Sequence, residues 1–220
     1  MAEAYRGVDE ATQAPVFVKR ALGTSDNGLS LERETRIYEK LNRTEADCFM
    51  GVLAFERAGD SVFLVTAFAD GGDLDEYLRE TPPAAKELPH IATSIADALA
   101  VLHGHGVVHR DIKPQNVLIH QGTFRLTDFG ISKNLMRLIT KHTMQGVGTP
   151  GYIAPEQLKR AEAHPSADIY SFGRLLDWDL IPPGVDRSAD WRSLIADCTA
   201  NDPDERPTID AVLARLRLMK

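Results

Sequence analysis

A polar stretch in the middle of the chain holds side chains suited to phosphoryl transfer. It reads HRDIKPQNVLI over residues 109–119 and is followed by LTDFG over residues 126–130. Asp111 lies in a turn after a short apolar pair, where its carboxylate can orient an attacking hydroxyl or accept its proton. Lys113, two residues later, can neutralise negative charge on a phosphoryl group in transfer.

Asn116 and Asp128 add oxygen ligands at the ends of two adjacent short strands, NVLI and FRLT. Two hard oxygen donors and phosphate oxygens together suit Mg²⁺, which keeps several waters and seldom takes a cage made of protein alone. Phosphoryl transfer depends mainly on positioning and charge neutralisation. The two stretches therefore predict a phosphoryl-transfer site that uses Mg²⁺.

The elements that must position these side chains begin with strands and a single helix. Residues 3–8 and 16–20 flank a polar turn and are typical of a hairpin. Residues 51–57 and 61–68 are apolar, β-branched and aromatic, and they predict a second hairpin. Between the hairpins, residues 29–42 (LSLERETRIYEKLN) repeat apolar side chains at helical spacing.

A glycine-containing segment, ADGGD at residues 69–73, is the expected hinge, after which the chain becomes mostly helical. Residues 89–106 place apolar side chains on one face of a helix that glycines end. Further helices are expected at residues 165–178, 189–200 and 208–218. The predicted fold class is α+β, with a β part that holds one helix over residues 1–69 and a mainly α-helical part over residues 70–220.

Composition and charge argue against several function classes. The chain has 220 residues, a net charge of −7 and a pI near 5.5, which argues against a nucleic-acid or anionic-membrane surface. No apolar run is long enough to cross a bilayer, and the first residues lack the apolar core of a signal peptide. Cys48 and Cys198 lie far apart and outside any ligand spacing, so we expect reduced thiols in a cytoplasmic protein.

In order and spacing, these motifs resemble those of a eukaryotic-type serine/threonine protein kinase catalytic domain. The resemblance covers nearly the whole chain and rests on VFVK (16–19), HRDIKPQN (109–116), DFG (128–130), GTPGYIAPE (148–156) and DIYSFG (168–173). Each motif alone has a plain structural explanation, such as a tight turn or a solvated lysine. Together they imply a bilobal kinase fold, with a small antiparallel β N-lobe and a mainly α-helical C-lobe. They also imply an enzyme that uses ATP and Mg²⁺ to phosphorylate serine or threonine in a protein substrate.

The resemblance also implies a role for each candidate site residue. Asp111 would orient the acceptor hydroxyl, Lys113 would steady the transferring group, and Thr149 would link the two. Asn116 and Asp128 would hold the metal. The groups expected around ATP are Lys19 on the α- and β-phosphates, Glu34 as its ion-pair partner, Thr66 at the gatekeeper position, Ala67 to Ala69 at the adenine, Asp73 at the ribose, and Leu118 as the pocket floor.

Other residues are expected to brace or control this site. By resemblance, Asp168 would brace the HRD turn from below, and Arg206 would pair with Glu156. Arg110, before the catalytic aspartate, implies control by phosphorylation of the segment after DFG. The candidate sites are Thr143 first and Thr140 second, with unmodified surface threonines as the alternative.

The chain departs from the family pattern in three places. Alignment places Met1 at the end of the glycine-rich phosphate loop or just past it, so the first strand and the loop are absent from the sequence and weaker ATP binding is expected. Phe17 stands where the family has an alanine over the adenine, and Ala4 where it has a valine. We interpret Phe17 as a cover for the adenine. The segment around residues 181–183 is short and rich in proline, so substrate docking would differ or depend on something outside the chain.

Two other functions stay open on the sequence alone. A pseudokinase that acts as a binding or scaffolding module would explain the absent phosphate loop. A kinase of small molecules is disfavoured by Lys113 and by the APE segment. If the chain is a serine/threonine protein kinase, its expected partners are ATP, a protein substrate, and either a regulatory partner or the remainder of a larger protein.

Overall fold

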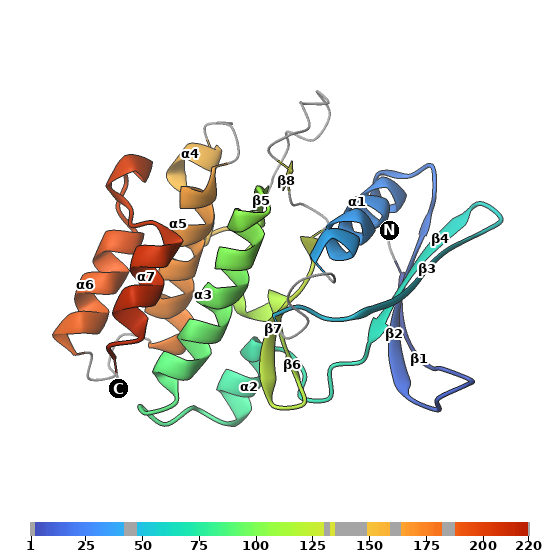
Figure 1. Cartoon of the computed structure of the whole chain (residues 1–220), viewed down its shortest axis with the longest axis horizontal. Helices are drawn as coiled ribbons and strands as arrows, with labels where there is room; N and C mark the ends of the chain where they lie inside the picture. The colour runs from blue at the N-terminus through green and yellow to red at the C-terminus, as the bar shows by residue number, and fades with distance from the viewer. Residues whose placement is uncertain are drawn as a thin grey trace.

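A four-stranded antiparallel sheet with one helix forms one end of the molecule, and a group of helices forms the other (Figure 1). The structure is a computed structural model that describes residues 3–41, 48–129, 133–134, 149–158, 164–181 and 188–219. None of the helices in these residues is long and apolar enough to span a membrane.

The sheet contains both predicted hairpins. Its strands are β1 (Glu3–Val8), β2 (Pro15–Leu22), β3 (Val52–Ala58) and β4 (Ser61–Ala67), in the order β1-β2-β4-β3. The turn between β3 and β4 needs Gly59, whose φ of 58° is the left-handed conformation that glycine adopts without steric cost. The register places Lys19 opposite Leu64 and Phe17 opposite Thr66. Since residues directly opposite share a face of the sheet, these four side chains point the same way.

Helix α1 (Asp26–Leu41) packs against the sheet through one apolar face, with Leu31, Ile37, Tyr38 and Leu41 buried. With the buried Glu34 and Thr35, these residues recur every three or four positions, which is the helical periodicity. The same face carries Glu34, a charged side chain that is only 2% exposed. Burial of a charge requires a partner, and this helix is therefore placed by a polar contact as well as by packing.

The helical part is built around α3 (Leu88–Gly104), whose buried face includes Ile91, Ile95, Leu99 and Leu102. The surrounding helices are α2 (Leu74–Glu80), α4 (Pro155–Leu158), α5 (Pro165–Leu175), α6 (Ala189–Cys198) and α7 (Ile209–Leu216). The short strands are β5 (Val107–Val108), β6 (Val117–His120), β7 (Thr123–Leu126) and β8 (Lys133–Asn134). Hairpin β6–β7 carries the polar motifs at its two outer ends.

The helix predicted over residues 165–178 is not regular throughout. It runs as an α-helix to Leu175 and continues as a π-helical turn, η3 (Leu176–Leu180). The Ile181 N–H donates to the Leu176 carbonyl at 2.9 Å, five residues back. A π turn adds one residue to the helical repeat and so changes which side chains face the neighbouring segment.

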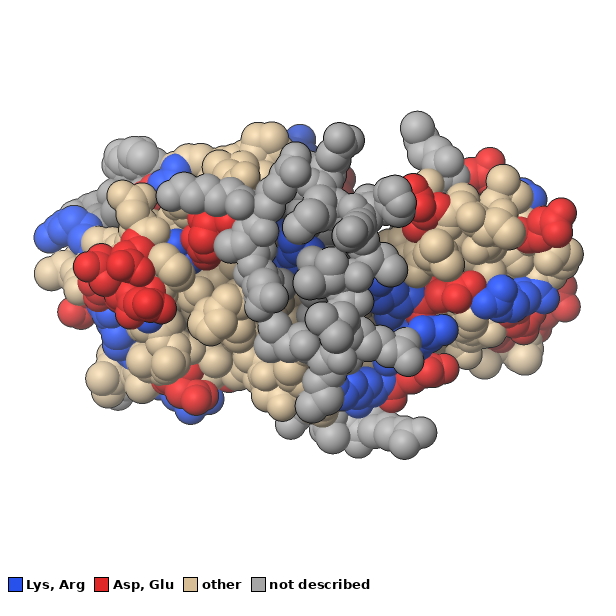
Figure 2. All heavy atoms as spheres, turned by 90° about the horizontal axis from the view of Figure 1, so that it is seen from above, with Lys and Arg blue, Asp and Glu red and all other residues tan. Residues whose placement is uncertain are grey.

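The α+β fold class and the bilobal arrangement are confirmed by this architecture. The division of the chain at residues 69 and 70 stays a prediction. Thr140, Thr143 and the Pro182–Pro183 pair lie outside the described residues. Seen from above, lysine and arginine side chains are interspersed with aspartate and glutamate over both parts (Figure 2), so the visible described surface is of mixed charge.

Candidate active site

The turn that carries the catalytic motif is held from below by Asp168, as predicted. This fully buried carboxylate accepts hydrogen bonds from the backbone N–H groups of His109 at 2.8 Å and Arg110 at 2.7 Å. The same carboxylate also lies 2.9 Å from Nε2 of His103. Arg110 has a φ of 75°, a costly conformation for a residue with a side chain. The Asp168 contacts fix this turn, which orients the residue that follows.

Asp111, that next residue, gathers three of the predicted side chains. Oδ1 of Asp111 accepts a hydrogen bond from Thr149 at 2.9 Å, and Oδ2 lies 2.8 Å from Nζ of Lys113. Lys113 also donates to the Thr149 hydroxyl at 2.8 Å. Burial of Asp111 acts to raise its pKa, but the contacts with Lys113, Thr149 and Asn116 outweigh burial and hold the pKa below its usual value. The carboxylate is therefore ionised at neutral pH.

Asn116 turns its amide nitrogen toward Asp111. Nδ2 donates to the backbone carbonyl of Asp111 at 2.7 Å and to its Oδ2 at 3.0 Å. Both amide hydrogens are thus used, and the oxygen Oδ1 is the end of the side chain that can bind a metal. Asn116 belongs to a single 3₁₀ turn (Pro114–Asn116) that leads directly into β6.

Asp128 follows β7 and reaches the same region from the other strand of the hairpin. Its φ of 66° is left-handed, and its side chain is 45% exposed. One carboxylate oxygen lies 3.7 Å from Nζ of Lys19. Asn116 and Asp128 flank the paired strands β6 and β7, and an amide oxygen with an exposed carboxylate is a donor set that Mg²⁺ accepts.

Lys19 on β2 and Glu34 on α1 form the predicted ion pair. Nζ of Lys19 lies 2.9 Å and 3.1 Å from the two carboxylate oxygens. Burial of Lys19 acts to lower its pKa, but the charges of Glu34 and Asp128 outweigh it and raise the pKa above its usual value. The lysine is therefore a fixed positive charge between the sheet and the metal-ligand candidates.

The residues predicted around ATP lie on two sides of this charge. Phe17 and the buried Thr66 are neighbours across β2 and β4, on the face that also carries Lys19. On the other side, Asp73 and Leu118 pair through an isolated β-bridge. Asp73 also has a structural role that the sequence does not predict, because its Oδ1 caps α2 by accepting from the Glu76 N–H at 2.9 Å.

Ala67 and Ala69 lie where the sheet continues into the segment that leads to α2. The Ala67 N–H donates to the Gly51 carbonyl at 3.1 Å, and Ala67 pairs with Val16 in the register of β2 and β4. Ala69 is half-buried. Both positions are compatible with the predicted backbone contacts to adenine, which stay a prediction.

A column of aromatic rings, which the motifs do not predict, links the two parts behind the polar site. The Phe129 ring packs edge-to-face against Tyr38 of α1, Phe49 and His109, with centroid distances of 4.8, 5.6 and 5.5 Å. Tyr38 and Phe129 are fully buried. The signal for Tyr38 in the sequence is its position one helical turn after Glu34, on the face of α1 that must be buried.

The segment at residues 149–152 rests on the far end of the α5 helix and its π turn. The Ser171 hydroxyl donates to the Tyr152 carbonyl at 2.8 Å, and the Tyr152 hydroxyl donates to Asp179 at 2.7 Å. Gly151 has a φ of 96°, and a Cβ placed there would lie 2.4 Å from the Trp178 ring. Glycine is therefore required at this position both by backbone conformation and by close approach.

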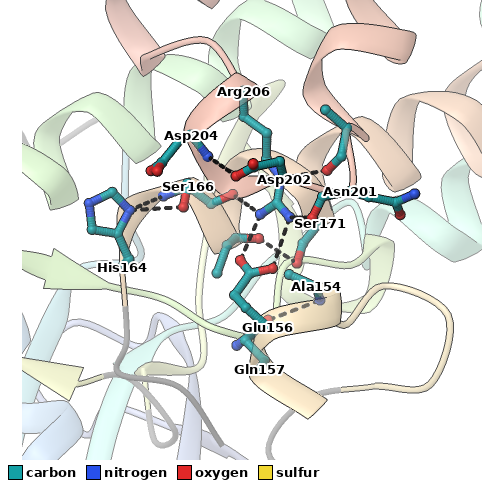
Figure 3. Close-up of polar contacts among 12 residues, drawn as sticks. Ala154, Glu156, Gln157, His164, Ser166, Ser171, Asn201, Asp202, Asp204 and Arg206 are labelled. Atoms are coloured by element: carbon teal, nitrogen blue, oxygen red, sulfur yellow. Dashed lines mark hydrogen bonds and ion pairs between the residues drawn. The ribbon is translucent and has the colours of Figure 1, made fainter. Parts of the chain in front are cut away.

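Helix α4 is fastened by the predicted pair of Arg206 and Glu156, shown in Figure 3. The guanidinium binds both carboxylate oxygens, at 2.7 Å and 2.8 Å. Its remaining hydrogen bonds go to the carbonyls of Ser166, Ala200 and Asn201, at 2.9, 2.9 and 3.3 Å. One arginine thus joins α4 to the start of α5 and to the loop before α7.

Comparison with known proteins agrees with this geometry. The family model described as Protein kinase domain matches residues 1–181. Among similar proteins, the serine/threonine-protein kinase PkaA of Streptomyces coelicolor is 35% identical over a 190-residue alignment that covers 73% of this chain and 35% of that protein. PknL of Mycobacterium tuberculosis is 33% identical over a 181-residue alignment that covers 78% of this chain and 44% of that protein. The probable serine/threonine-protein kinase PknB of Lactococcus lactis is 40% identical over 116 residues, 52% of this chain and 18% of that protein. The chain therefore spans less than half the length of these relatives.

Proposed function

The chain belongs to the protein kinase family, and on this premise we propose that it transfers the γ-phosphoryl group of ATP to a serine or threonine hydroxyl of a protein. The observation that carries the proposal is the closed set of contacts among Asp111, Lys113 and Thr149, with Asn116 bonded to the same carboxylate. These contacts support the proposal that the acceptor hydroxyl would be held at one place, beside Asp111.

Asp111 orients the acceptor hydroxyl toward the γ-phosphorus. Its depressed pKa makes it a weak base, so the hydroxyl keeps its proton until the new O–P bond is well advanced. The bond from the γ-phosphorus to the bridging oxygen lengthens and breaks as the new O–P bond forms, and ADP leaves with that oxygen. The proton passes to Oδ1 or Oδ2 of Asp111, and Lys113 offsets the negative charge beside it.

Asn116 and Asp128 fit Mg²⁺ because they offer an amide oxygen and an exposed carboxylate. When bound, the metal neutralises charge on the phosphate oxygens. Lys19, held by Glu34, is proposed to bind the α- and β-phosphates as a fixed charge. Phe17, Thr66, Ala67, Ala69, Asp73 and Leu118 are proposed to surround the nucleoside, with Phe17 covering the adenine in place of the family's alanine.

We also propose that the activity is controlled by phosphorylation of the segment after Asp128. Arg110 lies nearly buried beside the catalytic turn, and burial lowers its pKa. The charge of Asp168 acts to raise that pKa and the charge of Arg33 acts to lower it, and a phosphate on this segment would add a further negative charge that an arginine can pair with. Thr143 and Thr140 stay the candidate sites. With only two cysteines in the chain, a cytoplasmic location is proposed.

Incubation of the purified protein with labelled ATP, Mg²⁺ and a generic protein acceptor tests the function. We expect label on serine or threonine of the acceptor, and at least a hundredfold loss in Asp111→Asn, with Asp190→Asn on the exposed start of α6 as the matched control. No transfer by the wild type to any acceptor, together with tight binding of a protein partner, would favour a scaffolding role. Transfer to small metabolites alone would favour a small-molecule kinase.

A further inference from the structure

Tyr38 buries its hydroxyl at the contact between α1 and the strand that precedes Asp128. Its side chain is completely buried, and the hydroxyl oxygen lies 3.2 Å from Oγ1 of Thr127. A buried tyrosine hydroxyl needs a hydrogen-bond partner, because an unmade bond costs the full desolvation of the group. A phenylalanine would fill the same space without that requirement, so the hydroxyl calls for a separate explanation.

Thr127 is bonded to three different segments. Its backbone N–H donates to the Asn116 carbonyl at 3.0 Å, and its carbonyl lies 2.9 Å from Nε2 of His109. Its hydroxyl meets Tyr38. The next residue in the chain is Asp128, in its left-handed conformation. The threonine thus connects α1, the catalytic turn and the metal-ligand candidates through one residue.

Tyr38 contacts both neighbours of Asp128 in the chain. Its hydroxyl meets Thr127 on one side, and its ring packs against Phe129 on the other, at a centroid distance of 4.8 Å. Tyr38 also lies four residues after Glu34, hence on the same face of α1. A rotation or shift of α1 that broke the Tyr38 contact would therefore move Glu34 relative to Lys19 as well.

We propose that the Tyr38–Thr127 hydrogen bond is a positioning contact for phosphoryl transfer. It sets α1 against residues 127–129, so that the Lys19–Glu34 pair and the Asp128 carboxylate keep their places together. Tyr38 touches neither ATP nor the acceptor and acts through these groups. The kinetic test of this contact rests on the proposed kinase function. The hydrogen-exchange test does not depend on that function.

The test compares Tyr38→Phe and Thr127→Val, which each remove one hydroxyl, with Thr127→Ser, which keeps it. Thr35→Val is the matched control, because Thr35 is buried on the same helix and its hydroxyl donates to the Leu31 carbonyl of that helix, at 2.8 Å. We expect kcat/KM for ATP to fall about five- to tenfold in Tyr38→Phe and Thr127→Val. The KM for the protein acceptor should stay within about twofold, and Thr127→Ser should retain activity near the wild type. The double variant Tyr38→Phe/Thr127→Val should lose no more than either single variant.

Additive losses in the double variant, or a kinetic loss in Thr35→Val equal to that in Tyr38→Phe, would overturn the proposal. Hydrogen exchange gives a readout that needs no activity. Faster exchange in α1 and residues 127–129 of Tyr38→Phe, absent in Thr35→Val, supports the contact even if the wild type transfers no phosphate. Unchanged exchange in Tyr38→Phe overturns it, whereas an inactive wild type overturns only the kinase function.

Discussion

Replacing Glu156 with glutamine should destabilise the protein far more than a surface substitution does. The change leaves the side chain of Arg206, which has no solvent exposure, without its counter-charge. Removing one partner of a buried ion pair typically costs about 3–5 kcal/mol. Glu156 keeps 14% exposure, and the glutamine oxygen can still accept one hydrogen bond, so we expect about 2–3 kcal/mol. For a chain of this size that corresponds to a fall in Tm of roughly 5–10 °C.

The dependence of this loss on pH identifies the ion pair as its cause. Burial of Glu156 acts to raise its pKa, but Arg206 outweighs burial and holds the pKa below its usual value of 4.5. Because the folded pKa is depressed, the pair stabilises the protein above about pH 4.5, and this stabilisation is lost as the pH falls through the folded pKa. Glutamine does not titrate, so the two proteins should converge in stability at low pH.

Urea unfolding of wild type and Glu156→Gln at pH 7 and at several values below pH 4.5 measures both effects. Asp204→Asn, on the same loop as Arg206 but bonded through its backbone to Asp202, serves as the control. A difference below about 1 kcal/mol at pH 7, or one that stays constant into acid, would refute the reasoning.

Three further substitutions test the site itself. Gly151→Ala should lower kcat at least tenfold, because the new Cβ meets the Trp178 ring, the φ of 96° is strained, and the shift would move Thr149 away from Asp111. An unchanged kcat in steady-state assays would show that the position of this segment does not matter for transfer. Glu34→Gln should raise the KM for ATP and lower kcat, with a loss of about tenfold in kcat/KM, because the Lys19 ammonium loses its fixed position. Steady-state kinetics with ATP varied measures this, and equal kcat/KM in wild type and variant would exclude the pair from catalysis. Phe17→Ala should weaken ATP binding about five- to tenfold by exposing the adenine; unchanged affinity in calorimetry would reject Phe17 as its cover.

Side chains that belong to short polar motifs could be predicted from the sequence. Asp111, Lys113 and Asn116 lie within six residues of one another, so local backbone geometry brings them together. Lys19 and Glu34 are further apart, and their pairing was expected only from the resemblance to protein kinases. The structure adds the physical reason, since the buried Glu34 needs a charged partner.

Contacts that depend on how helices turn and pack could not be predicted. Nothing in the sequence marks the π turn at residues 176–180, since it contains neither glycine nor proline. Without that turn, Asp179 has no evident reason to face Tyr152. Tyr38 and Thr127 are 89 residues apart, and their hydrogen bond depends on the packing of α1 against residues 127–129, which no local pattern records.

Helix α5 binds the catalytic turn at one end, through Asp168, and the segment of Tyr152 along its length, through Ser171. The segments that carry Asp111 and Thr149 are thus both bonded to the same helix, α5. Lys19 lies on the sheet and Asp128 in the helical part, so the contact between them crosses the junction of the two parts. A change in the angle between the two parts would therefore change the distance from Lys19 to Asp128 while leaving the Asp111–Thr149 contact in place.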